Sequence, residues 1–163
     1  MRDLEGCKLK PMAALELDSG LLMAEWALCD RVVEYLAQVA GQMHEDAARY
    51  SNFLSLIVNE LVELAFKTSS REGTVKFEVH KDAEDLRISV SYLCREDDCQ
   101  NIVRLVRQTS AEKLRPQAAS TIPEDELRLV RLAKLFHVEL SAHAAAADWI
   151  TIASSLKWRG EFP

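Results

Sequence analysis

Charged and apolar side chains share the outward face of the helix predicted over residues 45–68. At about 100° per residue, the side chains that lie within about 60° of Glu60, away from the expected core, are Glu60, Glu63, Leu64 and Lys67. Glu63 and Lys67 are spaced for an i,i+4 ion pair, which stabilises a helix by only about 0.2–0.5 kcal/mol. Three interpretations of Leu64 are open at this point: an ordinary exposed leucine, the floor of a groove, or a contact with a partner. Glu63 and Leu64 are therefore the candidates for partner binding.

Two further groups of residues have side chains that could do chemistry. Cys94 and Cys99 are five positions apart, without a second cysteine pair or a histidine cluster, so no metal site is expected. His44 is followed by two acidic residues, as in many phosphoacceptor sites, which keeps a phosphotransfer protein as an alternative. The plainer interpretation of His44 is a loop residue between two helices.

The composition is that of a folded domain with an acidic surface. A chain of 163 residues is long enough for one domain with a core, and 26 acidic against 20 basic side chains give a net charge of -6. This charge repels phosphate backbones, so nucleic acid is not expected as a partner. The densest basic cluster is interpreted as part of a solvated helix face and the loop that follows it. Its residues are Arg104, Arg107, Lys113 and Arg115.

No segment predicts export or membrane insertion. The first ten residues lack the apolar region of a signal peptide, and no apolar run approaches the roughly 20 residues of a membrane span. We therefore expect a cytoplasmic protein with reduced cysteines and no membrane contact.

Hydrophobic periodicity predicts strands and helices in a definite order. Strands are expected over 12–17, 74–80, 86–93, 138–143 and 149–156, and helices over 21–43, 45–68, about 99–107 and 122–136, with a polar loop at 110–120. This order fits a two-layer α/β sandwich in which a mixed, mainly antiparallel sheet carries its helices on one face. Another α+β layout with the same order remains open. We expect one domain over 12–158, an extension over 1–11 and a tail over 159–163.

The apolar residues of the second helix fall on one broad face. They are Leu54, Val58, Leu61, Val62 and Ala65, and we expect them to pack on the sheet.

The stretch "ELVELAFKTS", which begins at Glu60, resembles the N-box of the GHKL superfamily, E-L-V-x-N-A-x-K-x-S. That superfamily comprises histidine-kinase catalytic domains, gyrase-like ATPases and anti-sigma-factor serine kinases. The segments at 12–38 and 125–156 also resemble the opening and closing parts of the anti-sigma kinase branch, so the likeness covers roughly residues 12–157. It implies the α/β sandwich, and this branch implies a homodimer.

The resemblance implies roles for three residues of the N-box. Glu60 takes the place of the glutamate that acts as, or orients, the base for phosphoryl transfer. Leu64 replaces the asparagine that coordinates magnesium, and its side chain has no oxygen for a hard cation. Asn59 is too far around the helix to substitute for it. Lys67 matches a basic residue that can meet a phosphate, and is the remnant of a cofactor-binding site.

The other two nucleotide motifs of the family are also altered. The adenine-reading aspartate and its glycines are replaced by Tyr92, Leu93 and Cys94, and no glycine occurs from Thr74 to Arg159. Asp97 and Asp98 come too late for that role and are expected to cap the next helix. Where a glycine-rich lid should lead into a phosphate-binding helix, the first helical turn is expected to contain Glu124, Asp125 and Glu126, which repel a triphosphate.

These departures predict a regulatory protein that binds another protein and does not bind Mg-ATP conventionally. The partner expected from the resemblance is a sigma factor, an antagonist or a response regulator, held until another protein displaces it. The alternative is an active protein-serine kinase of partner-switching type, with Glu60 as base, Lys67 on phosphate and ATP/Mg as cofactor. Whether the chain is an enzyme stays open at this point.

Overall fold

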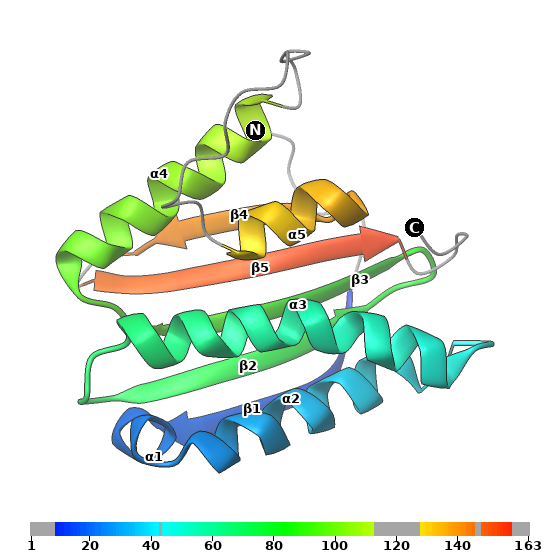
Figure 1. Ribbon diagram of the computed structural model, residues 1–163, viewed down its shortest axis with the longest axis horizontal. Coiled ribbons are helices and arrows are strands. Elements are labelled where there is room, and N and C mark those ends of the chain that lie inside the picture. The colour runs from blue at the N-terminus through cyan, green and yellow to red at the C-terminus, as the bar shows by residue number, and fades with distance from the viewer. Residues whose placement is uncertain (1–8, 43, 113–127, 146–147, 158–163) are drawn as a thin grey trace.

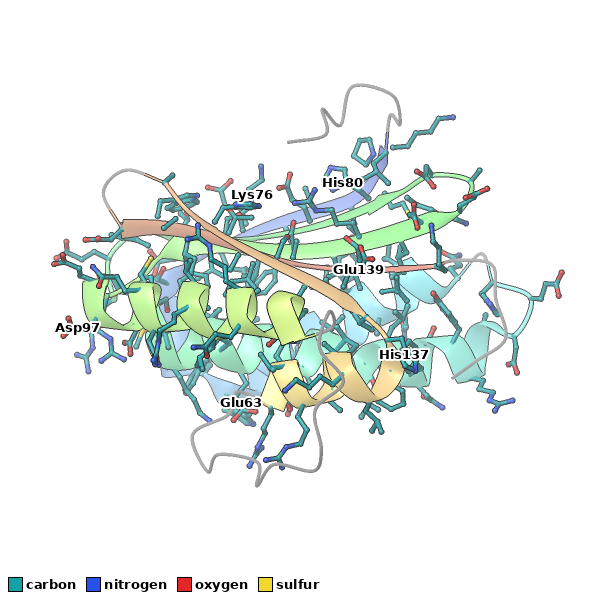
Figure 2. All side chains as sticks on the ribbon, turned by 90° about the horizontal axis from the view of Figure 1, so that it is seen from above. Glu63, Lys76, His80, Asp97, His137 and Glu139 are labelled. Atoms are coloured by element: carbon teal, nitrogen blue, oxygen red, sulfur yellow. The ribbon has the colours of Figure 1, made fainter. Side chains whose placement is uncertain are left out.

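The computed structural model forms a two-layer α/β sandwich, which confirms the predicted fold class (Figure 1). The structure describes residues 9–42, 44–112, 128–145 and 148–157. The helices lie on one face of a five-stranded sheet, as the view along the sheet in Figure 2 shows. The expected extension and tail therefore lie largely outside the described residues, as do Trp158, most of the loop at 110–120 and the start of the helix expected at 122–136.

The sheet has the strand order β1-β2-β3-β5-β4, and each neighbouring pair is antiparallel. We expected a mixed sheet, and the difference arises because both predicted hairpins form and then pair with each other through β3 and β5. The edges are therefore β1 and β4. The strands are β1 (Lys10–Asp18), β2 (Thr74–Lys81), β3 (Asp85–Leu93), β4 (Glu139–Ala144) and β5 (Trp149–Lys157).

The helix expected over 21–43 is two helices, which is a correction to the prediction. Its backbone breaks at Glu25, where φ is -129° and ψ is 100°. The break lets Leu22 enter the core while Trp26 remains 47% exposed, with its ring edge-on to Phe66 at 4.9 Å. The helices are α1 (Ser19–Ala24), α2 (Trp26–Gly41), α3 (Ala47–Thr68), α4 (Glu96–Glu112) and α5 (Arg128–Phe136).

Helix α3 lies across the middle of the sheet, with α2 on one side and α5 on the other (Figure 1). Asp46 caps its first turn by accepting a hydrogen bond from the backbone N–H of Arg49 at 3.3 Å. The predicted apolar face is confirmed, because each of its members is buried: Leu54, Val58, Leu61, Val62 and Ala65. Burial of one large apolar side chain stabilises the fold by about 1.5–3 kcal/mol. Burial of this face therefore holds α3 against the sheet.

No helix within the described ranges is both long and apolar enough to cross a bilayer.

Gly41 ends α2 at a point where the next helix approaches closely. A Cβ placed there would lie 2.2 Å from Ser51 Oγ and 3.1 Å from the Ser51 backbone nitrogen. We predict that Gly41→Ala lowers the free energy of unfolding by about 1–3 kcal/mol through overpacking, measured by urea denaturation. The double variant Gly41→Ala/Ser51→Ala removes the nearest atom and should recover part of the loss. Unchanged stability in the single variant would contradict this close approach.

Candidate functional site

A groove runs between α2, α3 and α5 on the side of the helices that faces away from the sheet. Its volume is about 450 Å³, and we call it the α3–α5 groove. Its lining consists of Val33 from α2, Ser55, Leu56, Asn59 and Glu60 from α3, and Arg128, Arg131 and Leu132 from α5. The predicted residue Glu60 therefore lies in a concave site together with residues from a distant part of the chain.

Glu60 is the half-buried acid of this groove. Burial and the neighbouring charge of Glu63 raise the pKa of the Glu60 carboxyl above its ordinary value. Arg128, Lys67 and a hydrogen bond with the Asn59 side chain act in the opposite direction. The net effect favours the protonated carboxyl, so Glu60 is a better proton acceptor than a solvated glutamate.

Glu63 lies beside the groove and is more enclosed than its place on the outward face predicts. Its side chain is 16% exposed and forms the expected ion pair with Lys67. Arg128 Nη1 lies 3.9 Å from Glu63 Oε2, so an arginine from α5 also faces this carboxylate. Figure 2 shows Glu63 on the helical side of the molecule, opposite the sheet face that carries Lys76 and His80.

Leu64 is buried, contrary to the expectation that it projects outward. It is 8% exposed and belongs to the core cluster. A helical wheel shows one apolar face for the sheet, but α2 and α5 also flank α3 and leave a narrower solvent-facing strip. Leu64 therefore has little surface to offer a partner, and the outward candidates that remain are Glu60, Glu63 and Lys67.

The end of β3, where the resemblance places the adenine-reading aspartate, is filled by protein side chains. Tyr92 is 0% exposed, and its hydroxyl lies 2.7 Å from Thr68 Oγ1 at the end of α3. Burial strongly raises the pKa of the Tyr92 phenol, so the group stays neutral. Thr68 Oγ1 in turn donates to the backbone carbonyl of Leu64 at 2.7 Å. The two altered motifs are thus joined by one chain of hydrogen bonds.

The acidic residues after β3 begin α4, as predicted. Asp97 and Asp98 lie in the first turn of α4, and Asp98 Oδ2 pairs with Arg95 Nε at 2.9 Å. The predicted carboxylates of the lid, Glu124, Asp125 and Glu126, lie outside the described residues.

Cys94 and Cys99 are buried neighbours at the start of α4. Their exposed fractions are 3% and 4%. Burial raises the pKa of the Cys94 thiol to about 12, so this sulfur is a poor nucleophile and a poor metal ligand at neutral pH. In the part of the chain that the structure describes, no three histidine, cysteine or acidic side chains are grouped to hold a metal ion.

His44 lies in the turn between α2 and α3. Its Nδ1 accepts a hydrogen bond from the Asp46 backbone N–H at 3.1 Å, and its ring stacks on Tyr50 with centroids 4.2 Å apart. These contacts suit a residue that shapes the turn, in line with the plainer interpretation.

Arg128 and Arg131 were not among the residues predicted to form a site. The basic cluster that the sequence suggested lies around Arg104 and Arg107, and Arg104 Nη2 donates to Asn101 Oδ1 at 2.7 Å on the exposed side of α4. The signal was present in "RLVRLAK", where two arginines three positions apart share the polar side of an amphipathic helix. What could not be read from the sequence is that this side of α5 faces Glu60.

The raised pKa of Glu60 predicts a pH-dependent effect of Glu60→Gln. A folded-state pKa above the unfolded value means that Glu60 stabilises the fold at low pH, and that this contribution is lost as the pH rises through the folded pKa. Glu60→Gln should therefore be more stable than wild type at pH 7, by less than about 1 kcal/mol because the carboxyl is partly solvated.

The gain from Glu60→Gln should shrink toward pH 4, as measured by urea unfolding across that pH range. Glu63→Gln is the matched control, and it should show no gain at pH 7 because it loses the ion pair with Lys67. A Glu60→Gln effect of constant size at all pH values would count against a perturbed carboxyl.

Comparison of this chain with protein-family models and with curated proteins finds no match.

Proposed function

We propose that this protein is a regulatory protein-binding module with a degenerate GHKL-like fold, which does not bind Mg-ATP conventionally and acts by sequestering a signalling or transcription partner. One observation carries the proposal. The residues that replace the magnesium and adenine ligands of the family, Leu64 and Tyr92, are buried and linked through Thr68. A nucleotide entering there would have to displace packed side chains and break the Tyr92–Thr68 hydrogen bond. Both steps cost free energy, and binding to a site with the family motifs does not require them.

A protein-serine kinase remains the second candidate because of Glu60. A half-buried carboxyl with a raised pKa, in a groove with two arginines, has the character of a general base beside a phosphate site. Phosphotransfer through His44 has weaker support, since Nδ1 of that ring already accepts a backbone hydrogen bond.

The free edge of β1 supports homodimerisation as part of the proposal. Ser19 N–H donates to Gly73 O at the end of the β1–β2 ladder, so the alternation of an antiparallel pair directs the N–H and C=O of Ala14, Glu16 and Asp18 to the open edge, on the C-terminal side of the register shift between Pro11 and Ala13. Two exposed apolar side chains, Leu21 and Trp26, follow this strand in α1 and α2.

Calorimetric titration with Mg-ATP tests the leading proposal. We predict no measurable binding by wild type at nucleotide concentrations up to about 1 mM. Leu64→Asn, which restores the amide of the family motif, should not gain binding, and should lose about 1–3 kcal/mol of stability because it buries a polar group. Leu64→Met is the control and should cost less than about 1.5 kcal/mol. Micromolar binding by wild type that Glu60→Ala abolishes would establish the kinase alternative instead.

The dimer proposal predicts different effects of proline on the two edge strands. Ala14→Pro removes an N–H from the open edge of β1 and should convert a dimer into a monomer in analytical ultracentrifugation, with the circular dichroism spectrum retained. Ala144→Pro on β4 is the matched control. Its N–H also points to an open edge, because Ala145 N–H donates to Trp149 O on β5, and this variant should stay dimeric. A monomeric wild type, or equal dissociation of both variants, would refute pairing through β1.

A further inference from the structure

We propose that the α3–α5 groove binds a short acidic segment of a partner protein, with apolar residues of the segment on Leu56 and its carboxylates on Arg128 and Arg131. This inference rests on the proposed function, because it names the chemistry of the partner that the module would hold.

The shape suits an extended occupant. The α3–α5 groove shares Ser55 with a second hollow of about 690 Å³, which follows the seam between α2 and α3 past Tyr35 and Asn52. The two hollows are therefore neighbours along α3. Together they have room for several residues of a peptide, whereas a small metabolite would fill only one of them.

Both hollows are lined in part by apolar side chains. Leu56 is 48% exposed and Tyr35 is 47% exposed, and both belong to the few large apolar side chains that the described residues leave in solvent. Val33 and Leu132 add partly buried apolar surface on opposite sides of Leu56. A peptide that covers these side chains would remove apolar surface from water, which contributes a favourable free energy of about 25 cal/mol per Å².

The rim of the groove is basic, although the chain as a whole carries a net charge of -6. Arg128 is 72% exposed at its side chain, and its one ion pair among the described residues is the long 3.9 Å contact with Glu63. Glu63 is already neutralised by Lys67. Arg131 is exposed and has no ion pair or hydrogen bond with any described residue. The described residues therefore leave two guanidinium groups available for carboxylates, which arginine binds through paired N–H donors.

The floor of the groove favours a peptide over a bare anion. Glu60 presents a carboxyl that accepts hydrogen bonds, and Asn59 and Ser55 add polar groups beside it. An extended peptide supplies backbone N–H donors for these acceptors while its acidic side chains reach the arginines on the rim. A small dianion would bring its charge next to Glu60 with no donor to offer.

The experiment measures fluorescence anisotropy with three labelled synthetic peptides that alternate leucine with glutamate, glutamine or lysine. The glutamate peptide should bind wild type with a Kd of tens of micromolar, and more weakly as salt is raised, because exposed charges are screened. Arg131→Glu should weaken binding at least about tenfold, and the glutamine and lysine peptides should bind less well than the glutamate peptide. Leu56→Ser should weaken the glutamate and glutamine peptides alike.

Arg104→Glu is the matched control, since it makes the same charge change on an exposed arginine of α4, outside the groove. It should leave binding unchanged, and circular dichroism checks that each variant is folded. The inference is overturned if no peptide binds, if the lysine peptide binds as well as the glutamate peptide, or if Arg104→Glu and Arg131→Glu weaken binding equally. Those outcomes would leave the regulatory proposal standing, because that proposal fails on Mg-ATP binding, which is measured separately.

Discussion

The packing of α3 against the sheet is the constraint on which the rest of the molecule depends. The apolar face of this 22-residue helix lies over the sheet, and its sides contact α2 and α5. Because α3 is held from three sides, little of its surface reaches solvent. The polar residues that do reach the outside, Asn59, Glu60 and Glu63, therefore lie at the bottom or the margin of a groove and do not form a fully solvated stripe.

The C-terminal end of α3 is held by hydrogen bonds to the end of β3 and to the turn between β3 and α4. The last carbonyls of a helix lack partners within the helix. Here the Ala65 carbonyl accepts from the Ser69 N–H at 2.9 Å, Lys67 O accepts from Arg95 Nη2 at 2.8 Å, and Thr68 O accepts from the Arg95 N–H at 3.3 Å. Together with the Tyr92–Thr68 hydrogen bond, these contacts join α3 to the β3–α4 junction. In this chain, the residues at the place that would hold nucleotide in a GHKL enzyme make contacts that hold the fold together. This is why we favour a binding module over a kinase.

The groove and the filled region lie on different parts of α3 and have opposite character. Near Thr68 the hydroxyls of Thr68 and Tyr92 are hydrogen-bonded to each other, with Tyr92 inaccessible to water. Near Glu60 the charges are only partly balanced, since Arg131 lacks a partner among the described residues and the Glu60 pKa is raised. Imperfectly paired groups in a concave site are typical of surfaces that bind something, whereas paired and buried groups are typical of a structural core. Function is therefore best sought at the Glu60 end.

The sequence by itself determined the order of the elements, both hairpins and the buried face of α3, because strands and helices impose periods of about 2 and 3.6 residues on the apolar pattern. It could not determine the break at Glu25, the burial of Leu64 or the meeting of Glu60 with Arg128 and Arg131. Each of these depends on which distant segment packs beside a given residue. A helical wheel shows which residues of α3 share a side but not that α5, more than 60 positions later, covers part of that side. Only the tertiary structure brings those two helices together, and with them the residues of the groove.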